Sequence, residues 1–465
     1  MLEGLEISII NTKDLEKGLR IDSEIYQKEY IAYDNFIKEK EYTTFNQEAL
    51  VVKKGIFDIK SAVYREKGIP FVRISNLRNM IIDTNDIIYI PEEENKKNLD
   101  TFLEEGDIIL SKTAYPAASY VNIANCNTSQ DTVAIKLSQQ SNLLSEYIVI
   151  FLNSEIGLKQ MRRRFTGNIQ MHLNLEDCKT NLLIPILSTI FQNEIKNLFH
   201  KSIQRKDDST YLYNKAEQLL LEELDLKDWE PSTENINSKS FKESFLTTGR
   251  LDAEYYQPKY EELLFKIRSF KTKPLGKIVS IIKSIEPGSD AYQDIGVPFV
   301  RVSDITKFEI TEPSIHLDKH EYGELGLQPK KDTILLSKDG SVGIAYKLEQ
   351  DMNIITSSAL LHLEVLDNEF IPDYLALILN SVVVKLQAER DAGGSIIQHW
   401  KPSEIEEVII PKLSEDIQQK ITDKIQQSFA LKRQSQYLLE VAKRAVEIAI
   451  EENEEMGMNY IKSNI

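Results

Sequence analysis

Short apolar runs alternate with polar turns that carry glycine or proline in two long stretches of the chain. In the first stretch these runs include residues 70–75, 107–111 and 132–137, which are rich in β-branched side chains. Such runs between turn residues are typical of strands. Each stretch then continues with apolar positions at helical spacing, over 145–164 and 373–390. The pattern therefore predicts a mixed α/β globule in each stretch.

A second kind of pattern follows each globule. Apolar side chains recur every three or four positions, at Phe191, Ile195, Leu198, Phe199 and Ile203 and again at Ile417, Ile421, Ile425 and Phe429. This spacing predicts two amphipathic helices of roughly 38 residues, or about 57 Å each, the first interrupted near 207–209. Neither globule supplies a neighbour long enough to cover its helix. We therefore expect the two helices to pair, in antiparallel fashion.

The chain contains an internal repeat. Residues 20–27 recur as 250–257, and residues 68–77 recur as 296–305. Shorter matches join 108–112 with 334–338, 152–154 with 379–381, 184–185 with 410–411 and 211–216 with 437–442. The order is preserved at an offset of about 226 to 230 residues, a period far too long for a solenoid. The chain is thus predicted to hold two copies of one domain.

These patterns predict an α+β protein made of two tandem α/β domains that two long antiparallel helices join and separate. The expected parts are a first globule over 1–187, a central helix over 188–227, a polar linker over 228–249, a second globule over 250–413 and a C-terminal helix over 414–458. The last residues, 451–465, carry a run of glutamates and Gly457 and are expected to fray.

Composition excludes several classes of protein. The 465 residues are 42% hydrophobic, enough for several folded domains, and the net charge of −17 excludes a simple basic coat for nucleic acid. Two cysteines, Cys126 and Cys178, and six histidines cannot form a disulfide framework or a structural zinc cluster. The acidic amino terminus and the absence of an apolar run of about 18 residues predict no signal peptide and no membrane span. A reducing, cytoplasmic compartment is expected.

Signatures of catalysis are missing from the sequence. There is no G-x-x-x-x-G-K-S/T phosphate loop, no G-x-G-x-x-G after a strand, no H-E-x-x-H helix and no G-x-S-x-G elbow. No Asn-Pro or Asp-Pro-Pro segment precedes an aromatic residue in the way that would hold an amino group for methylation, and Pro372-Asp373 lacks a following Glu-x-Lys. The chain is therefore predicted to be non-catalytic.

Basic and amide side chains gather instead at equivalent places in the two copies. Residues 159–172 hold four cations and no anion, and residues 390–401 combine glycines with basic and amide groups. The side chains suited to bases or phosphates are Arg162, Arg163, Arg164, Asn168, Gln170 and His172 in the first copy and Gln398, His399 and Lys401 in the second. A solvated helix end with a loop is the competing interpretation.

Two further places could contact DNA. The strand ends carry Arg73, Ser75 and Asn76 in one copy and Arg301, Ser303 and Asp304 in the other, which either read bases or cap a turn. The turn at 337–343, with Lys338, Ser341 and its glycines, either admits a phosphate or is a plain hairpin. The first copy has no glycine there and presents Lys112 and Tyr115 instead.

This organisation resembles the specificity subunit of type I restriction–modification systems over nearly the whole chain. The most specific pieces are Ile397-Gln398-His399 and the proline-bearing helix entry over 410–421, which 184–195 echoes. The resemblance implies that each globule is a target recognition domain for one half of a split site in double-stranded DNA. It implies phosphate contacts from Lys112 and the three arginines 162–164 as well.

The resemblance also implies partners. The paired helices would set the spacing between half-sites and dock two methyltransferase subunits, with ATP-driven translocase and nuclease subunits added when the assembly cuts. No cofactor is expected on this chain, because S-adenosylmethionine, ATP and Mg²⁺ would belong to those partners. The alternative is a non-enzymatic scaffold whose helices and globules bind only proteins, which the acidity and the missing catalytic signatures suit equally well.

Overall fold

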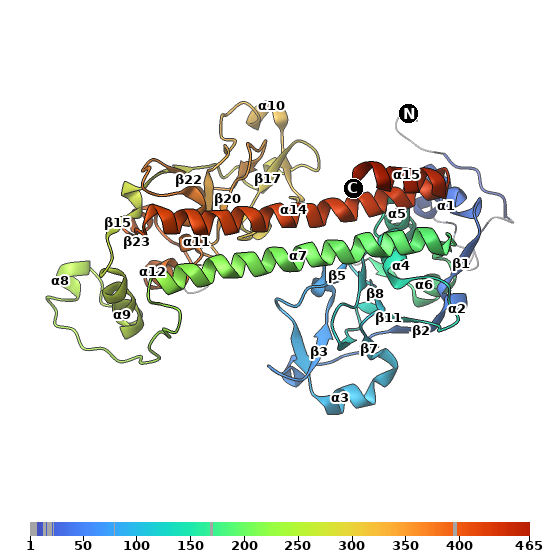
Figure 1. Cartoon of the computed structure of the whole chain (residues 1–465), viewed down its shortest axis with the longest axis horizontal. Coiled ribbons are helices and arrows are strands. Elements are labelled where there is room, and N and C mark those ends of the chain that lie inside the picture. Colours follow the sequence, from blue (N-terminus) through green and yellow to red (C-terminus); the bar gives the residue numbers. More distant parts are fainter. Residues whose placement is uncertain are drawn as a thin grey trace. The chain divides into compact units, whose positions relative to one another are not determined.

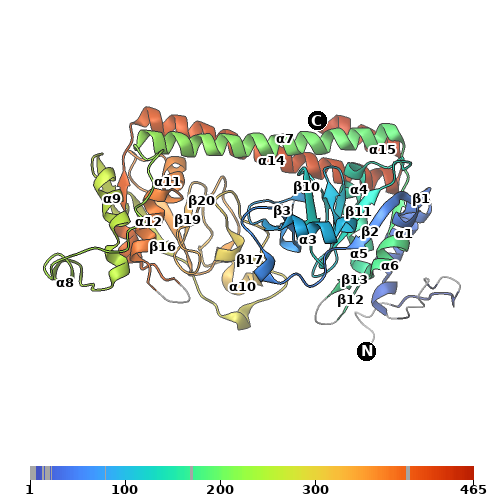
Figure 2. The same cartoon turned by 90° about the horizontal axis from the view of Figure 1, so that it is seen from below.

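The computed structural model of this chain describes residues 7–12, 15, 21, 23–78, 80–167, 171–393 and 398–465. These residues form two compact units (Figures 1 and 2). Unit 1 comprises the chain up to Arg205 together with Arg433–Ile465, and unit 2 comprises Lys206–Lys432. Each unit thus holds one globule and part of both long helices. The domain boundaries drawn from the sequence stay a prediction.

A six-stranded sheet is the centre of unit 1. Its order is β2 (Ala49–Lys54), β11 (Thr132–Leu137), β8 (Ile108–Ser111), β9 (Ala118–Tyr120), β5 (Ile81–Ile82) and β4 (Leu77–Arg78). β8 and β2 flank β11 in antiparallel register, whereas β5 runs parallel to β9. The apolar runs at 107–111 and 132–137 therefore form strands, as predicted, and these strands are neighbours in the sheet.

Smaller sheets complete the globule of unit 1. One has the order β6 (Ile88–Ile90), β3 (Ile69–Val72), β10 (Asn125–Thr128) and β7 (Leu103–Glu104); the two-stranded ones pair β1 (Tyr42–Thr44) with β14 (Leu183–Pro185) and β12 (Phe165–Thr166) with β13 (His172–Leu173). The helices around them are α1 (Lys28–Lys38), α2 (Phe45–Glu48), α3 (Glu92–Lys97), α4 (Ser145–Leu152), α5 (Glu155–Arg164) and α6 (Leu175–Thr180).

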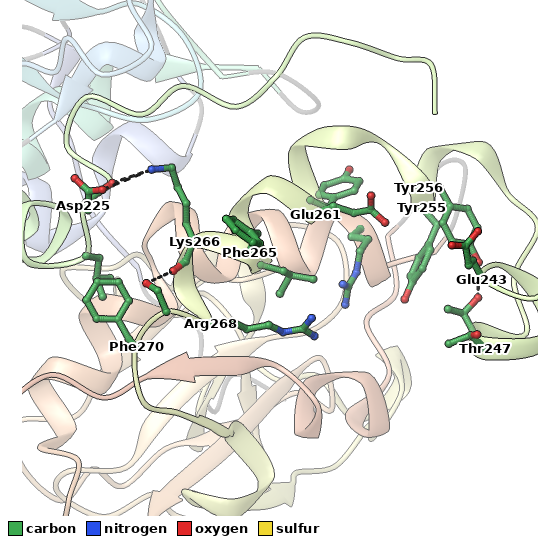
Figure 3. Close-up of a pocket in the computed structure, with 16 residues that line it drawn as sticks. Asp225, Glu243, Thr247, Tyr255, Tyr256, Glu261, Phe265, Lys266, Arg268 and Phe270 are labelled. Carbon is green, nitrogen blue, oxygen red and sulfur yellow. Dashed lines mark hydrogen bonds and ion pairs between the residues drawn. The ribbon is translucent and has the colours of Figure 1, made fainter. Parts of the chain in front are cut away.

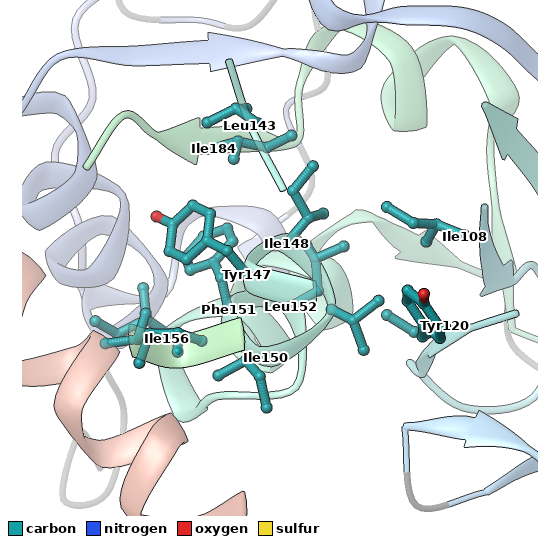
Figure 4. Packing of buried hydrophobic residues seen from close by; sticks show 14 of the residues in the cluster. Ile108, Tyr120, Leu143, Tyr147, Ile148, Ile150, Phe151, Leu152, Ile156 and Ile184 are labelled. Carbon is teal, nitrogen blue, oxygen red and sulfur yellow. The ribbon is translucent and has the colours of Figure 1, made fainter. Parts of the chain in front are cut away.

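The core of unit 1 fills both faces of the six-stranded sheet. Ile108 and Leu110 of β8 join a large cluster with Tyr147 and Phe151 of α4, while Ile109 between them belongs to a separate cluster on the other face (Figure 4). Successive side chains of a strand point to opposite faces. Both faces are covered, so Ile108, Ile109 and Leu110 are all apolar and buried.

Unit 2 repeats this plan with fewer strands. Its sheets have the orders β16 (Val279–Lys283), β22 (Leu360–Val365), β19 (Ile334–Ser337), β20 (Ala345–Lys347); β18 (His316–Leu317), β17 (Val297–Val300), β21 (Ile355–Thr356); and β15 (Thr272–Pro274), β23 (Ile409–Pro411). Its helices include α8 (Phe245–Thr248), α9 (Pro258–Ile267), α10 (Lys319–Tyr322), α11 (Pro372–Leu379), α12 (Val382–Asp391) and α13 (Pro402–Glu406). The order β16-β22-β19-β20 corresponds to β2-β11-β8-β9 in unit 1.

The single helices predicted over 145–164 and 373–390 are each two helices, so those predictions were wrong. Asn153 ends α4 and donates its side-chain N–H to the carbonyl of Ala118 at 2.8 Å, and Asn380 does the same to Ala345 at 2.7 Å. The next residue in each unit, Ser154 or Ser381, caps the second helix. In both units the asparagine therefore bonds to a strand at the point where a continuous helix was expected.

Two long helices are present, α7 (Thr189–Glu223) and α14 (Glu415–Glu451). Within unit 1, Phe191 near the start of α7 shares a core with Ala449 near the end of α14. Within unit 2, Leu220 near the end of α7 shares a core with Ile421 near the start of α14. In each unit the helices consequently pack against one another in opposite directions (Figure 1).

The interruption predicted near 207–209 does not occur, because α7 is continuous there. The Ser209 hydroxyl lies 3.0 Å from that of Ser428 on α14 and is buried, so it bonds to the partner helix instead of competing for its own backbone. A similar contact in unit 1 joins Ser202 and Ser435 at 3.0 Å.

The carboxyl-terminal segment is helical, so the expected fraying was wrong. α15 (Glu454–Asn464) buries Ile461, and the Glu454 carboxylate accepts the Ser188 amide N–H at 2.8 Å. A Cβ atom on Gly457 would lie 2.9 Å from the Phe191 ring, so the glycine allows a close approach to the start of α7. Among the described residues, no helix has the length and apolar character needed to cross a bilayer.

Candidate nucleic-acid interface

In unit 1 the turn after β8 is bound to the strand that carries His172. The Leu173 amide donates to the Lys112 carbonyl at 2.8 Å, and the Ala114 amide donates to the Met171 carbonyl at 3.2 Å. The Lys112 amide in turn donates to Asp131 at the start of β11 at 2.8 Å. These bonds bring Lys112 and His172, which are 60 positions apart in the chain, into one small surface. Asn168 and Gln170 lie outside the described residues.

Tyr115 extends this surface toward the end of β3. The Ser111 hydroxyl, in a buried position, donates to the Tyr115 carbonyl and accepts the Ala117 amide at 2.8 Å, which fixes the turn. The Tyr115 hydroxyl donates to the Ile74 carbonyl at 3.1 Å, although 44% of the side chain stays exposed. Partial burial raises the pKa of Tyr115, so the phenol stays protonated and able to donate.

Unit 2 builds the same arrangement from the matching residues. The Trp400 amide donates to the Lys338 carbonyl at 2.8 Å, and the Gly340 amide donates to the Gln398 carbonyl at 3.0 Å. The Ser337 hydroxyl donates to the Ser341 carbonyl at 2.6 Å, as Ser111 does in unit 1. Because the hydrogen bonds correspond, Met171 and His172 of unit 1 occupy the positions that Gln398 and His399 occupy in unit 2.

The two surfaces differ in how they hold their histidine. His399 Nδ1 lies 2.8 Å from the Asp339 carboxylate, which also pairs with Lys338, and 64% of the His399 side chain is exposed. Thr113 replaces Asp339 in unit 1, and there His172 Nδ1 is buried without a hydrogen-bond partner among the described residues. In unit 2 the surface thus carries an imidazole that a carboxylate positions beside a lysine. The surface of unit 1 has no such carboxylate next to its histidine.

Asn76 and Asp304 serve the fold, which corrects their interpretation as base readers. Asn76 is fully buried, accepts the Arg73 amide at 2.9 Å and donates to Asp86 at 2.7 Å. Asp304 accepts the Arg301 amide at 2.8 Å and is mostly buried. Each therefore closes a short 3-10 turn after its strand. Arg73 pairs with Asp86 at 3.2 Å and keeps about a third of its side chain exposed, and Ser303 is exposed.

The arginine run also divides. Arg163 and Arg164 are buried and both pair with the carboxylate of Asp34 on α1, itself 2% exposed. The Arg163 Nε–H donates to the carbonyl of Ile25 at 2.5 Å. These two guanidinium groups join α5 to α1 and cannot reach a phosphate without leaving the core. The prediction that Arg163 and Arg164 contact phosphates was therefore wrong. Arg162 alone is exposed.

The remaining candidates lie at the surface. Gln398 is exposed, as is Ser341, while Lys338 keeps 17% of its side chain exposed. Lys401 precedes α13, where its amide donates to the Glu404 carboxylate at 3.1 Å and 73% of its side chain is exposed. Ser75 and Arg301 are half-buried.

Lys54 is a member of the unit 1 surface that the sequence pattern did not single out. Burial and, to a smaller extent, the positive charge of Lys54 lower the pKa of Lys112. Both lysines flank the start of β11, where the Gly55 amide donates to the Thr132 carbonyl at 3.1 Å. The Lys53-Lys54-Gly55 sequence at a strand end was the available signal.

Neither the two cysteines, which are in unit 1, nor a cavity of unit 2 belongs to these surfaces. Cys126 and Cys178 are free and buried, and burial raises the pKa of each thiol to about 12. A cavity of about 930 Å³ next to α9 is lined in part by Tyr255, Arg268 and Lys266, the last paired with Asp225 at 3.8 Å (Figure 3). None of the predicted DNA-contacting residues lines it. Within the described part of the chain, no group of three or more potential metal ligands is found.

Comparison with known proteins identifies the class of this fold. Residues 268–440 match the family model described as "Type I restriction modification DNA specificity domain". That segment includes most of the second globule and the first part of α14. The resemblance to the specificity subunit of type I restriction–modification systems is thereby confirmed for this part of the chain.

Two solved structures are similar to this chain at low sequence identity. The S subunit of a type I system from M. genitalium has 15% sequence identity and a TM-score of 0.40, with 89% of this chain and 96% of that chain covered. The HsdS subunit from Thermoanaerobacter tengcongensis has 14% identity and a TM-score of 0.28, with 89% and 97% covered. A comparison with curated proteins found no match.

Proposed function

We propose that this chain is the non-catalytic, DNA-reading subunit of a type I restriction–modification complex and recognises a bipartite, interrupted site in double-stranded DNA. One observation carries the proposal: both units bind the turn after a central strand to a second segment with the same hydrogen bonds, at Lys112 and Lys338. Because each arrangement presents a different set of basic, amide and aromatic side chains, the two would read different half-sites.

The match extends from the reading surfaces to the scaffold. Tyr147 donates its hydroxyl to the Pro185 carbonyl at 2.8 Å, and Tyr374 donates to Pro411 at 2.7 Å. Gln192 and Gln418 both bond to the turn just before their own long helix, at 2.8 and 3.0 Å. These equal contacts support the proposal that the chain is a duplicated target recognition domain, each copy mounted on its own long helix.

The paired helices are the natural spacer and docking element in this proposal. α-Helices of 35 and 37 residues extend about 1.5 Å per residue, so helix length would fix the distance spanned by the unread bases. We propose that two methyltransferase subunits dock here, with translocase and nuclease subunits in a cutting complex. S-adenosylmethionine, ATP and Mg²⁺ would then be bound by those partners, which carry the chemistry. An overall charge of −17 suits surfaces that face partner proteins.

Within each half-site we expect a division of labour. Lysine contacts to phosphates would set the register, and side chains that reach base edges would select the sequence. The candidates that keep exposed groups are Arg73, Ser75, Lys112, Tyr115, Arg162 and His172 in unit 1 and Arg301, Ser303, Lys338, Ser341, Gln398, His399 and Lys401 in unit 2.

The test is the methylation pattern of the host genome. With the chain present, adenines in one interrupted sequence should be methylated, and deletion of the chain alone should abolish this methylation. The complex isolated through a tag on this chain should bind that sequence with an affinity that falls steeply as salt rises. A protein-interaction scaffold would leave the methylation pattern unchanged and would bind DNA without regard to sequence, and either result would overturn the proposal.

A further inference from the structure

A groove in unit 1 lies outside the residues assigned so far. Its volume is about 420 Å³, and it is formed by the end of β2 and by the segment from α3 to residue 101. Charged and apolar side chains line it together: Lys53, Lys54, Phe57, Lys96, Lys97 and Asp100. Four lysines against one carboxylate is an unusual balance in a chain whose net charge is −17.

The lysine side chains of these ion pairs are exposed and open to exchange. Lys97 pairs with Glu94 at 3.0 Å and Lys96 with Glu92 at 3.9 Å, and both lysines have 70% or more of the side chain exposed. Lys53 pairs with Asp100, which is 75% exposed. Exposed pairs of this kind contribute little to stability. The ammonium groups can therefore exchange these carboxylates for the phosphates of a ligand.

The groove continues into the reading surface of unit 1. Lys54 lies 4.6 Å from the centre of the Phe57 ring, and that ring is 72% exposed. The Gly55 amide donates to the Thr132 carbonyl at 3.1 Å and the Lys112 amide to the Asp131 carbonyl at 2.8 Å, so Lys54 and Lys112 both lie next to the start of β11. A polyanion held by Lys112 would thus meet a further line of positive charge along the end of β2 and the last turn of α3, where Lys96 and Lys97 lie.

The residues at the matching place in unit 2 are different. The parallel bridges Ile56–Ser129 and Ile285–Ser357 align the two units. Glu286 then takes the position of Phe57 and Ile282 that of Lys53, while Lys283 matches Lys54. Glu286 accepts a hydrogen bond from the Ser358 hydroxyl at 2.9 Å. Unit 2 therefore keeps one of these lysines and replaces Lys53 and Phe57, so the full lining of the groove is not repeated there.

We propose that this lysine groove binds backbone phosphates of double-stranded DNA next to the half-site that unit 1 reads. The inference rests on the proposed function, because it takes DNA as the polyanion. The contact is independent of sequence: ammonium groups on flexible side chains recognise phosphates as point charges and read no base edge. Unit 1 consequently holds a longer stretch of duplex than unit 2, and anchors the complex on its side of the site.

The experiment compares variants in the complex isolated through a tag on this chain. Anisotropy titrations use a labelled duplex with the methylated sequence and a second duplex with that sequence scrambled, over a series of salt concentrations. In K96Q/K97Q, the slope of log K against log salt should fall by about 0.9 for each phosphate that a lysine no longer neutralises, or about 2 in all. Both duplexes should bind more weakly by the same factor, so that discrimination between them is unchanged. K54Q should show the same pattern with a change of about 1.

A matched control removes two exposed lysines of unit 2 that lie outside every segment assigned to DNA, in K271Q/K277Q. A salt slope for K96Q/K97Q no different from this control would overturn the groove as a phosphate site and leave the proposed function standing. Weaker binding of the methylated sequence alone would also overturn it, because the lysines would then be reading bases. Wild-type complex that does not discriminate the two duplexes would instead refute the proposed function.

Discussion

His362 sits at the centre of β22 in unit 2, with 6% of its surface exposed, and its Nε2 lies 2.8 Å from the Thr356 hydroxyl. Burial disfavours the charged imidazolium and lowers the pKa of this histidine from 6.5 to about 4. The unfolded chain therefore takes up the proton first as pH falls. The neutral form contributes stability that is complete above about pH 6.5 and is lost between pH 6.5 and 4.

We therefore expect unit 2 to lose about 2 kcal/mol of unfolding free energy from this group between pH 6.5 and pH 5. Both tryptophans of the chain, Trp229 and Trp400, lie in unit 2, so urea denaturation followed by tryptophan fluorescence reports on it. The variant H362Q should show a flatter dependence on pH by that amount. H320Q, which changes an exposed histidine of the same unit, should follow the wild type. Equal curves for H362Q and the wild type would contradict the assignment.

Single residues also mark the limit of what the sequence could predict. Arg162, Arg163 and Arg164 form a run of identical charge, yet only Arg162 is exposed. The reason lies more than a hundred residues away, because Asp34 on α1 supplies a buried countercharge. A local pattern carries no information on such a long-range partner. Lys112 and Lys338, by contrast, follow a strand directly, and the turn that carries each could be predicted from its strand.

At the scale of elements, one carboxylate at the same position in each globule contacts a long helix. Glu146 of α4 lies 2.7 Å from His200 Nε2 and 3.3 Å from Lys196, both on α7. Asp373 of α11 accepts from Gln426 of α14 at 3.2 Å and pairs with Lys347 at 3.1 Å. The positions match between the units, but the helix partners of Glu146 are half-exposed, whereas the Lys347 side chain is only 4% exposed.

This difference in exposure predicts unequal costs for the matched variants. D373N removes one carboxylate from the buried Lys347, which keeps Glu349 at 2.8 Å and Asp332 at 3.4 Å. We expect it to lower the unfolding free energy by about 2 kcal/mol. E146Q lets its partners return to water, and we expect about 1 kcal/mol. Tryptophan fluorescence in urea measures the first, and hydrogen exchange of the α4 amides measures the second. A cost for E146Q equal to or above that of D373N would contradict this account.

Elements were predicted well where one period of apolar residues ran through them and poorly where a long-range bond interrupted the pattern. The strands at 107–111 and 132–137 and the long helices α7 and α14 follow directly from their spacing. The breaks at Asn153 and Asn380 do not, because each asparagine bonds to a strand of the sheet. α15 was missed because its buried side is completed by Phe191 on a distant helix.

On the scale of the whole molecule, a chain with a negative net charge can bind DNA, as proposed, if its lysines are gathered at one place. The cations of unit 1 that are proposed to face DNA, among them Lys54 and Lys112, gather at the start of β11. At moderate salt, the electrostatic field near a charge cluster is set by the charges within about 10 Å. Carboxylates farther away therefore do not cancel the field of these lysines. Association with DNA should accordingly depend on salt as that of a small basic patch does.

Each unit builds its reading surface entirely from its own residues, and this predicts modular specificity. Replacement of residues 1–187 by the first globule of a homologue should change one half of the methylated sequence and leave the other half and the spacing intact. The donor must keep apolar side chains where Tyr147 and Ile184 pack with Phe191, because that core joins the globule to α7. Methylome sequencing of the host reads both halves at once. A change in both halves would mean that the two surfaces do not act independently. A changed spacing with both halves retained would show that the globule, and not the helix pair, sets the distance between the half-sites.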